Sequence, residues 1–412
     1  MKKISGVIRI IISIFLFQLF FSIKCYAQFN NDFEIERHYL DMENFLDWKA
    51  YQIPFSWKYE WDVTQSGMSA SVGSISLYEF YTYTTIRLAK DFGPLVSFQY
   101  DQVEDAFYRD APLYQEIEFR FGEVYGASLI GFPPHDKKNG HVGYALSYGK
   151  RHTLSSVRLS LLDQYSFYNE RNVNSEKNTV EGHFRKTPKL SRFEALWLLN
   201  SHFYLKTDLK QITKAVFKID EPEQLLTFQG NEYEFTIDWR RDDSWVLGTT
   251  AYHKEEYREQ IPTNGTEDLP DLNQILLLSW LDIYLHVQAS TKSRVTIGVL
   301  SSQFLNDIDS SYTDQRYDCH LRTLQLYGFW QKARSDWFYW LYSLQAGKAE
   351  LDKDYEGIKK TVDEENLEMK AGIGIIMMEE SNYRLLVNTT WDLDFFETRQ
   401  WDGGNVQLQM VF

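Results

Sequence analysis

The segment Asn405-Val-Gln-Leu-Gln-Met-Val-Phe412 alternates between polar and apolar side chains. Val406, Leu408, Met410 and Phe412 fall at every second position, and polar residues occupy most of the positions between them. Successive side chains of a β-strand point to opposite faces, so a period of two predicts a strand with one apolar and one polar face.

The same period of two recurs along the chain, at Phe55–Val63, His141–Gly149, Tyr233–Arg240 and Tyr383–Phe395. In each segment, aromatic and aliphatic residues predominate on one face, and charged, polar or small residues on the other. A closed sheet in a bilayer requires such strands, with an apolar face toward lipid and a polar face toward the lumen. A soluble sandwich would instead bury an apolar inner face, so the charged inner face argues against it.

A chain with such strands and an aromatic carboxyl-terminal residue resembles bacterial outer-membrane β-barrel proteins of the Bacteroidota type. The resemblance is generic and porin-type, and it points to no named subfamily. It implies an all-β, transmembrane, up-and-down antiparallel β-barrel in the cell outer membrane, surrounded by lipid and lipopolysaccharide. It also implies that Phe412 is the signal recognised by the barrel assembly machinery.

Residues 1–27 have the pattern of a secretory signal peptide. An apolar run follows the basic residues Lys2, Lys3 and Arg9. This run is shorter than the roughly 20 residues of a transmembrane helix. We expect cleavage before Gln28 and export. Residues 28–52 are then an N-terminal periplasmic or plug segment, or an additional strand, and residues 53–412 form the barrel.

Connection lengths support the barrel. Short turns are expected near Thr187–Ser191 and Arg241–Ser244, and long polar loops near Glu259–Asn273 and Asp352–Glu365. Short periplasmic turns that alternate with long extracellular loops are typical of outer-membrane barrels.

The same connections predict the strand number. From His141 onward about thirteen strands follow, if Leu209–Asn231 is a long loop or an inserted hairpin. The first third of the chain suggests strands at residues 53–63, 73–90, 94–107 and 113–130. Either one of these lies outside the barrel or residues 30–50 add another, because an even total is required. We expect about 16 strands, within a range of 14 to 18.

The acidic balance of the chain restricts its partners. Four of the 43 Lys and Arg lie in residues 1–27, which leaves 39 basic against 58 acidic residues and a net charge near −19. Such a charge excludes nucleic acid as a partner, because nothing offsets phosphate repulsion. Acidic loops can hold divalent cations beside lipopolysaccharide, or they can simply keep the exposed parts solvated. The oligomeric state is left open.

The polar inner face is where a specific function would lie. Alternation places these residues there: Lys58, Glu60, Asp62, Glu116, Glu118, Arg120, Arg158, Glu234, Asp238, Arg240, Asp282, His286, Arg294, Asp318, His320, Arg322, Lys370, Arg384, Asp392 and Asp394. Opposite charges across a pore orient dipolar solutes and set ion preference. The alternative is that the same charges pair across strands and hold the barrel together.

Signals for catalysis or cofactors are weak. Gly67-Met-Ser-Ala-Ser71 lacks the last glycine of a nucleophile elbow, and Gly372-Ile-Gly374 lacks the third glycine of a dinucleotide loop. Cys319 is the single cysteine left after cleavage, and no histidine pair has metal-ligand spacing. We expect no catalytic residues, no metal site, no cofactor and no enzymatic activity.

Two functions remain open at this point. The first is a passive, porin-like channel for small polar or charged solutes. The second is a non-conducting barrel with a structural, assembly or surface-attachment role. If the barrel conducts, the acidic surplus predicts a modest preference for cations.

Overall fold

The computed structural model describes residues 67–74, 80–104, 109–110, 113–122, 124–131, 142–149, 155–164, 182–199, 202–219, 224–242, 244–262, 272–310, 315–355, 362–377, 383–393 and 401–411. The expected signal peptide, the segment 28–52, Phe412 and the lumen candidates Lys58, Glu60, Asp62 and Asp394 lie outside these residues. Within them, no helix is long and apolar enough to cross a membrane.

The described residues form strands almost throughout. Their bounds are β1 Gly67–Ser74, β2 Phe80–Asp91, β3 Leu95–Glu104, β4 Arg109–Asp110, β5 Leu113–Phe121, β6 Tyr125–Ile130, β7 Val142–Gly149, β8 Ser155–Gln164, β9 Gly182–Lys186 and β10 Leu190–Leu198. The remaining strands are β11 Phe203–Ile219, β12 Gln224–Asp242, β13 Trp245–Pro262, β14 Leu272–Ser290, β15 Ser293–Ser310, β16 Gln315–Ser335, β17 Phe338–Tyr355, β18 Val362–Met377, β19 Tyr383–Asp392 and β20 Trp401–Val411.

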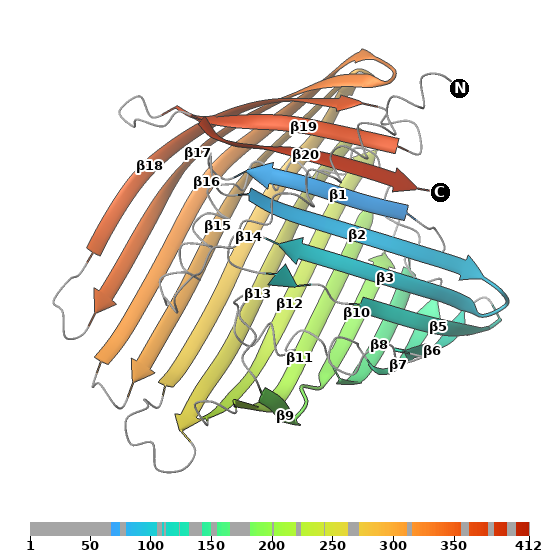
Figure 1. Cartoon of the computed structure of the whole chain (residues 1–412). Helices are drawn as coiled ribbons and strands as arrows, with labels where there is room; N and C mark the ends of the chain where they lie inside the picture. Colours follow the sequence, from blue (N-terminus) through green and yellow to red (C-terminus); the bar gives the residue numbers. More distant parts are fainter. Residues whose placement is uncertain are drawn as a thin grey trace. The chain divides into compact units, whose positions relative to one another are not determined.

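Among the described residues, eighteen of these strands pair antiparallel in a ring (Figure 1). Each pairs with its neighbours in sequence, except that β3 pairs with β5 and β8 pairs with β10. The ladder then returns from β20 to β1. The predicted up-and-down antiparallel β-barrel is therefore confirmed, with a strand number at the upper end of the range of 14 to 18 rather than at 16.

The short strands β4 and β9 are not additional members of the ring. β9 pairs with Val216–Ile219 of β11, and β10 pairs with Tyr204–Ile212 of the same strand. The chain therefore continues in one direction through residues 187–189. Pro188 has no N–H to donate, and a bulge between Ile212 and Ala215 lies opposite on β11. The turn expected at Thr187–Ser191 is thus an interruption within one strand.

Of the two alternatives for Leu209–Asn231, the hairpin agrees with the structure, because most of the segment belongs to the ladder between β11 and β12. One other expectation about the strands was wrong. Residues 113–130 are not one strand but two, β5 and β6, which pair with each other. Gly122 in the turn between them has a φ of 68°, which a glycine adopts without strain. From Val142 onward, the described part of the chain nevertheless has the thirteen ring strands that were expected.

The outer face of the ring is apolar. On β7, Tyr144, Leu146 and Tyr148 are each more than half exposed, whereas Ala145 between them is buried. Val406 on β20 is exposed too, on the face that the sequence predicted for it. Exposed apolar side chains that repeat on every second residue form the surface that lipid requires.

Exposed aromatic residues gather where the strands adjoin short turns. They include Phe92, Phe121, Tyr125, Tyr148, Trp197, Phe203, Trp239, Trp245, Trp330, Trp337 and Trp340. Such a girdle marks the interface between hydrocarbon and water. By the barrel convention, this short-turn end of the ring faces the periplasm.

The strands differ in length around the ring. β11 to β18 have 16 to 21 residues, whereas β5 to β8 have 6 to 10. A membrane needs only about 9–11 residues of a tilted strand. The long strands therefore extend beyond the hydrocarbon at the long-loop end, where their outer face no longer has to be apolar.

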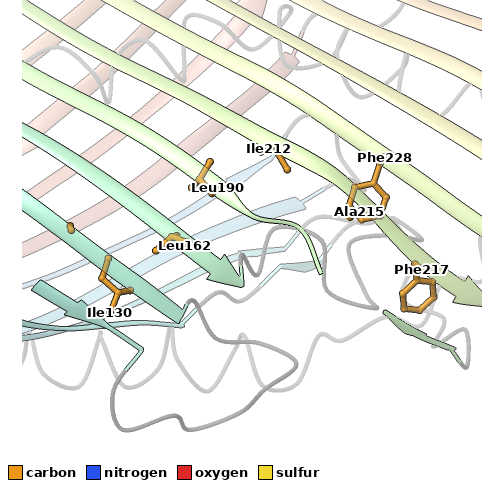
Figure 2. Close-up of a cluster of buried hydrophobic side chains, with 8 residues drawn as sticks. Ile130, Leu162, Leu190, Ile212, Ala215, Phe217 and Phe228 are labelled. Atoms are coloured by element: carbon orange, nitrogen blue, oxygen red, sulfur yellow. The ribbon is translucent and has the colours of Figure 1, made fainter. Parts of the chain in front are cut away.

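A cluster of buried apolar side chains lies on the inner face near the long-loop end (Figure 2). It comprises Ile130, Ala145, Leu162, Leu190, Ile212, Ala215, Phe217 and Phe228, with Phe184 and Leu226 packed against it. Phe184 makes edge-to-face contacts with Phe217 and Phe228, at centroid distances of 5.0 and 6.2 Å. These contacts hold β9 against the ends of β11 and β12.

Candidate functional site on the inner wall

Charged side chains on the inner face of β5 to β13 form a series of ion pairs, which we call the charge belt. Its members are Glu116, Arg158, Arg192, Glu194, Lys206, Asp208, Lys210, Glu232, Glu234, Lys254, Glu256 and Arg258. They share one face because paired residues in an antiparallel ladder point to the same side of the sheet.

Strand register explains why the belt needs both signs. Glu194, Asp208 and Glu234 are directly opposite one another on β10, β11 and β12. Carboxylates placed side by side in this way repel each other. Arg192 and Lys210 stand in the neighbouring row, two residues along, so a cation lies diagonal to the carboxylates of β10 and β11.

The first part of the belt is deeply buried. Arg158 Nη2 lies 3.1 Å from Glu116 Oε1, and the two side chains are only 6% and 1% exposed. The guanidinium also lies 3.8 Å from Glu194 Oε2 and donates a hydrogen bond to Ser160. A buried charge pair persists only where such additional hydrogen bonds satisfy its remaining polar atoms.

The centre of the belt is a bidentate pair. Arg192 donates from Nε and Nη2 to the two oxygens of Asp208, at 2.8 and 2.6 Å. Its Nη2 also lies 3.2 Å from Glu194 Oε1. A planar guanidinium matches a carboxylate in this way, which fixes both side chains in one orientation.

Toward β13 the belt becomes more accessible. Lys210 Nζ donates to Glu232 at 2.6 Å, and Lys206 Nζ donates to Glu234 at 2.9 Å. The Lys206 side chain is 47% exposed although it lies on the inner face. The pair of Lys206 with Glu234 is therefore accessible to solvent.

The belt ends at Glu256 on β13, which is 1% exposed. Lys254 Nζ and Arg258 Nε lie on either side of its carboxylate, at 3.3 and 2.8 Å. Four residues before Glu256 on the same strand, the ring of Tyr252 stacks on that of Trp280, with centroids 5.5 Å apart. Beyond this point the chemistry of the inner wall changes.

On β14 to β19 the inner face carries a cluster of buried apolar side chains among buried polar ones, and we call this cluster the apolar wall. It contains Leu300, Tyr327, Phe329, Tyr339, Leu341, Ile376 and Leu386, with Trp280, Tyr284 and Ala333 packed against them. Each of the first seven is at most 5% exposed. Buried polar residues of the same face include Gln325, Gln345, Lys370 and Asn388.

Two tyrosines connect the apolar wall to carboxylates. Tyr284 Oη donates to Asp238 at 2.6 Å, and Tyr327 Oη donates to Asp282 at 2.7 Å. The ring of Tyr284 crosses Gly248, where a Cβ would collide with that ring and with the Asp238 carboxylate. A glycine is therefore required at this position of β13.

The structure places many of the expected lumen residues on the inner face. Buried ones are Glu116, Glu118, Arg158, Asp238, Asp282, Lys370 and Arg384, and partly or fully exposed ones are Arg120, Glu234, Arg240, His286 and Arg294. Asp392 lies opposite Lys370 in the ladder. Within the set of expected lumen residues, Glu116 and Arg158 form an ion pair.

Three expected lumen residues instead lie on the outer face. Asp318, His320 and Arg322 share a face of β16 with Leu324 and Leu326, which are 56% and 58% exposed. The opposite face of β16 carries residues such as Cys319, Leu321 and Tyr327, all of them buried. The outer face can be charged there because β16 extends beyond the membrane at the long-loop end.

The sequence interpretation missed most of the belt. The missed members are Arg192, Glu194, Lys206, Asp208, Lys210, Glu232, Lys254, Glu256 and Arg258. A signal was present in Lys206-Thr-Asp-Leu-Lys210, where charges alternate with Thr and Leu. It was overlooked because the chain from Leu209 was taken for a long loop or an inserted hairpin outside the counted strands.

No model of a protein family matches the chain, and no curated protein is similar to it in sequence. Among solved structures it is similar to OmpT of Vibrio cholerae, at 7% identity, over 84% of this chain and 96% of that one, with a TM-score of 0.36. It is also similar to OccK8 (OprE) of Pseudomonas aeruginosa, at 7% identity, over 84% of this chain and 97% of that one, with a TM-score of 0.38. A third similar structure is the translocator domain of the autotransporter NalP from Neisseria meningitidis, at 8% identity, over 92% of this chain and 97% of that one, with a TM-score of 0.33.

Similarity at this level says nothing of function, and the fold is established by the strand pairing and by the two faces described above. The chain folds as an outer-membrane β-barrel. The generic resemblance predicted from the sequence is thereby confirmed, without a named subfamily. The specific function of this barrel depends on its inner wall.

Proposed function

We propose that this outer-membrane β-barrel is a passive channel for small polar or charged solutes. The observation that carries the proposal is the charge belt, which lines the inner face of an eighteen-strand ring in the described part of the chain. Barrels of 16 to 18 strands are wide enough for an aqueous channel. Catalysis has no part in this proposal.

Accessibility of the belt supports it. Lys206 and Arg192 have side chains that are 47% and 35% exposed, although both face the interior of the ring. Water or a solute can therefore reach them from within. Alternating charges along such a wall would attract dipolar solutes and orient them during passage.

The test is single-channel recording of the refolded full chain in a planar bilayer. The proposal predicts discrete conductance steps, and Lys206→Glu should change their size because it reverses a charge that faces the lumen. Arg322→Glu on the outer face is the matched control and should leave the steps unchanged. Absence of steps at high protein concentration would contradict the channel.

A second candidate is a non-conducting barrel with a structural, assembly or surface-attachment role. The apolar wall favours it, because Ile376 and Leu386 face the interior and are 0% exposed. Buried apolar side chains at this depth indicate a packed region rather than a water-lined surface on that side. Under this alternative the bilayer stays silent while the protein still inserts. Lipid, lipopolysaccharide and the assembly machinery are proposed partners under either candidate.

A further inference from the structure

Basic side chains gather at the long-loop end of β9 and β11, and we call this group the basic patch. Its members are Arg185, Lys186, Lys189 and Lys214, and all four are exposed. They come from β9, from the interruption between β9 and β10, and from the bulge of β11. Figure 1 shows β9 beside the end of β11, so these parts of the chain are neighbours in space.

Strand register brings the members of the patch together. Lys186 is directly opposite Val216 on β11. The N–H of Lys189 donates to Thr213 Oγ1 at 3.3 Å, and the N–H of Thr213 donates to the carbonyl of Lys189 at 2.9 Å. Lys214 lies between these two contacts along β11. Opposite and diagonal positions of neighbouring strands are roughly 5–8 Å apart, so one ligand can reach Lys186, Lys189 and Lys214 together.

The patch belongs to the outer face of the ring. Val216 lies between Ala215 and Phe217, which are both 0% exposed on the inner face. Successive side chains of a strand alternate between faces, so Val216 points outward. Lys186, which is opposite Val216, shares its face because paired residues of an antiparallel ladder point to the same side.

Two carboxylates of the described residues contact the patch. Lys189 Nζ donates to Asp163 at 3.0 Å, and Lys214 Nζ donates to Glu259 at 3.1 Å. All four of these side chains are at least 41% exposed, so solvent weakens both pairs. In the described part of the chain, no carboxylate pairs with the other two members of the patch. These described side chains therefore leave a surplus of positive charge.

The position of the patch along β11 corresponds to the membrane surface. β11 begins with Phe203 of the periplasmic aromatic girdle, and Lys214 follows eleven residues later. A strand that rises about 3.3 Å per residue at a tilt of about 40° spans roughly 28 Å over that length. The apolar band of an outer-membrane barrel is about 25 Å tall. The patch therefore lies just beyond the hydrocarbon, at the level of the headgroups of the outer leaflet.

Positive charge is not general on the outer face at the long-loop end. Among the side chains that the structure describes on β15 to β17, acidic residues outnumber basic ones there: Asp307, Asp309, Asp318, Glu350 and Asp352 stand against His320, Arg322 and Lys348. The chain as a whole is acidic as well, with a net charge of −15. A group of exposed cations on such a protein indicates a local anionic partner.

We propose that the basic patch binds the phosphate groups of lipopolysaccharide in the outer leaflet. The inference goes beyond the proposed channel and does not depend on conduction. A guanidinium donates two parallel hydrogen bonds to a phosphate, and lysines at a membrane surface attract anionic headgroups. Closer to the membrane centre, Phe193 and Leu209 are opposite each other on the outer face of β10 and β11, where they contact the acyl chains of the same lipid.

The first experiment measures the binding of bisphosphorylated lipid A to the refolded full chain by native mass spectrometry. Arg185→Gln/Lys186→Gln should lower the apparent affinity about fivefold or more, because it removes two unpaired cations. Arg322→Gln/Lys348→Gln, on the outer face of β16 and β17, is the matched control. It removes the same charge and should leave the affinity unchanged. Equal affinities of the unchanged protein and the patch variant would overturn the proposal.

A second measurement uses the unchanged protein alone, so it does not depend on the folding of a variant. Lipid A without its phosphates should bind about fivefold or more weakly than the bisphosphorylated form. EDTA should leave the binding of bisphosphorylated lipid A intact, because the patch needs no divalent cation. Loss of binding in EDTA would assign the contact to carboxylates bridged by divalent cations, and it would overturn the proposal.

Competition with inorganic pyrophosphate distinguishes a lipid headgroup from a soluble anion. Pyrophosphate should fail to displace lipid A, because it lacks the acyl chains that contact the apolar band. Displacement at equimolar concentration would indicate a site for soluble anions and would overturn the assignment to lipopolysaccharide. A barrel that binds lipid A through the patch without conducting would refute the channel alone.

Discussion

Ion pairs of the charge belt hold together the inner face of β5 to β13, whereas packed apolar side chains and tyrosine hydroxyls contribute to that of β14 to β19. Both walls have the same apolar outer face, with Ile237 exposed on one and Leu326 exposed on the other. Lipid constrains the outer face alone, so the two inner walls are free to differ. The stability of the charge belt depends on every charged side chain keeping its partner. The stability of the apolar wall depends on side chains that fill the space between the strands.

The largest effect is expected where a buried charge loses its partner. Arg158→Met should destabilise the barrel by about 3–5 kcal/mol, because Glu116 would remain buried without its cation. Urea unfolding in detergent, followed by tryptophan fluorescence, measures the loss. The double variant Arg158→Met/Glu116→Gln should recover most of it. If the double variant were as unstable as the single one, the stability of the charge belt would not depend on ion pairing.

On the apolar wall the corresponding change is a loss of volume. Leu341→Ala should cost about 2–5 kcal/mol, because the side chain is 2% exposed and its removal leaves a cavity. Leu344→Ala on the same strand is the control, since Leu344 is 52% exposed on the outer face and lipid can fill the space. Equal losses in the two variants would show that the apolar wall is not packed.

Outer-face substitutions test whether the difference between the walls is confined to the interior. Ile237→Arg and Leu326→Arg should each cost about 2–4 kcal/mol if the positions lie near the bilayer midplane. The two costs should agree within error, because both side chains face lipid. Thr236→Arg, on the inner face of the same strand as Ile237, should cost much less. Unfolding in lipid vesicles gives all three values.

The smallest effect is expected at the accessible part of the charge belt. Lys206→Ala removes a pair with Glu234 whose side chains are 47% and 29% exposed, and it should cost about 0.2–1 kcal/mol. Added salt should reduce the difference further, because screening acts on exposed pairs within about 8 Å at physiological ionic strength. A loss comparable to that of Arg158→Met would mean that solvent does not reach this part of the lumen.

Strand faces could be predicted where one face is plainly apolar. On β7 the exposed Tyr144, Leu146 and Tyr148 already show the outer face in the sequence. On β16 the same information was present in Leu324 and Leu326, whose alternation extends back to Arg322. The charge of Arg322 was given more weight than this alternation. Charge is a misleading guide to the inner face on a strand that is long enough to extend beyond the membrane.

The partners within the charge belt could not be predicted. Arg192 and Asp208 are 16 residues apart, and which residues of β10 and β11 are opposed depends on register. A single sequence contains the residue types and their alternation, but not the offset between neighbouring strands.

The ladder between β1 and β20 gives the ring a seam. It joins residues 67–74 to residues 404–411, so it closes the longest loop in the described part of the chain. Contacts of such high sequence separation form late in folding. β1 has eight residues, Gly67-Met-Ser-Ala-Ser-Val-Gly-Ser74, which bring few large side chains to the contact. Native-state hydrogen exchange should therefore be faster for amides of this seam than for those between β14 and β15, and the ring should begin to open there.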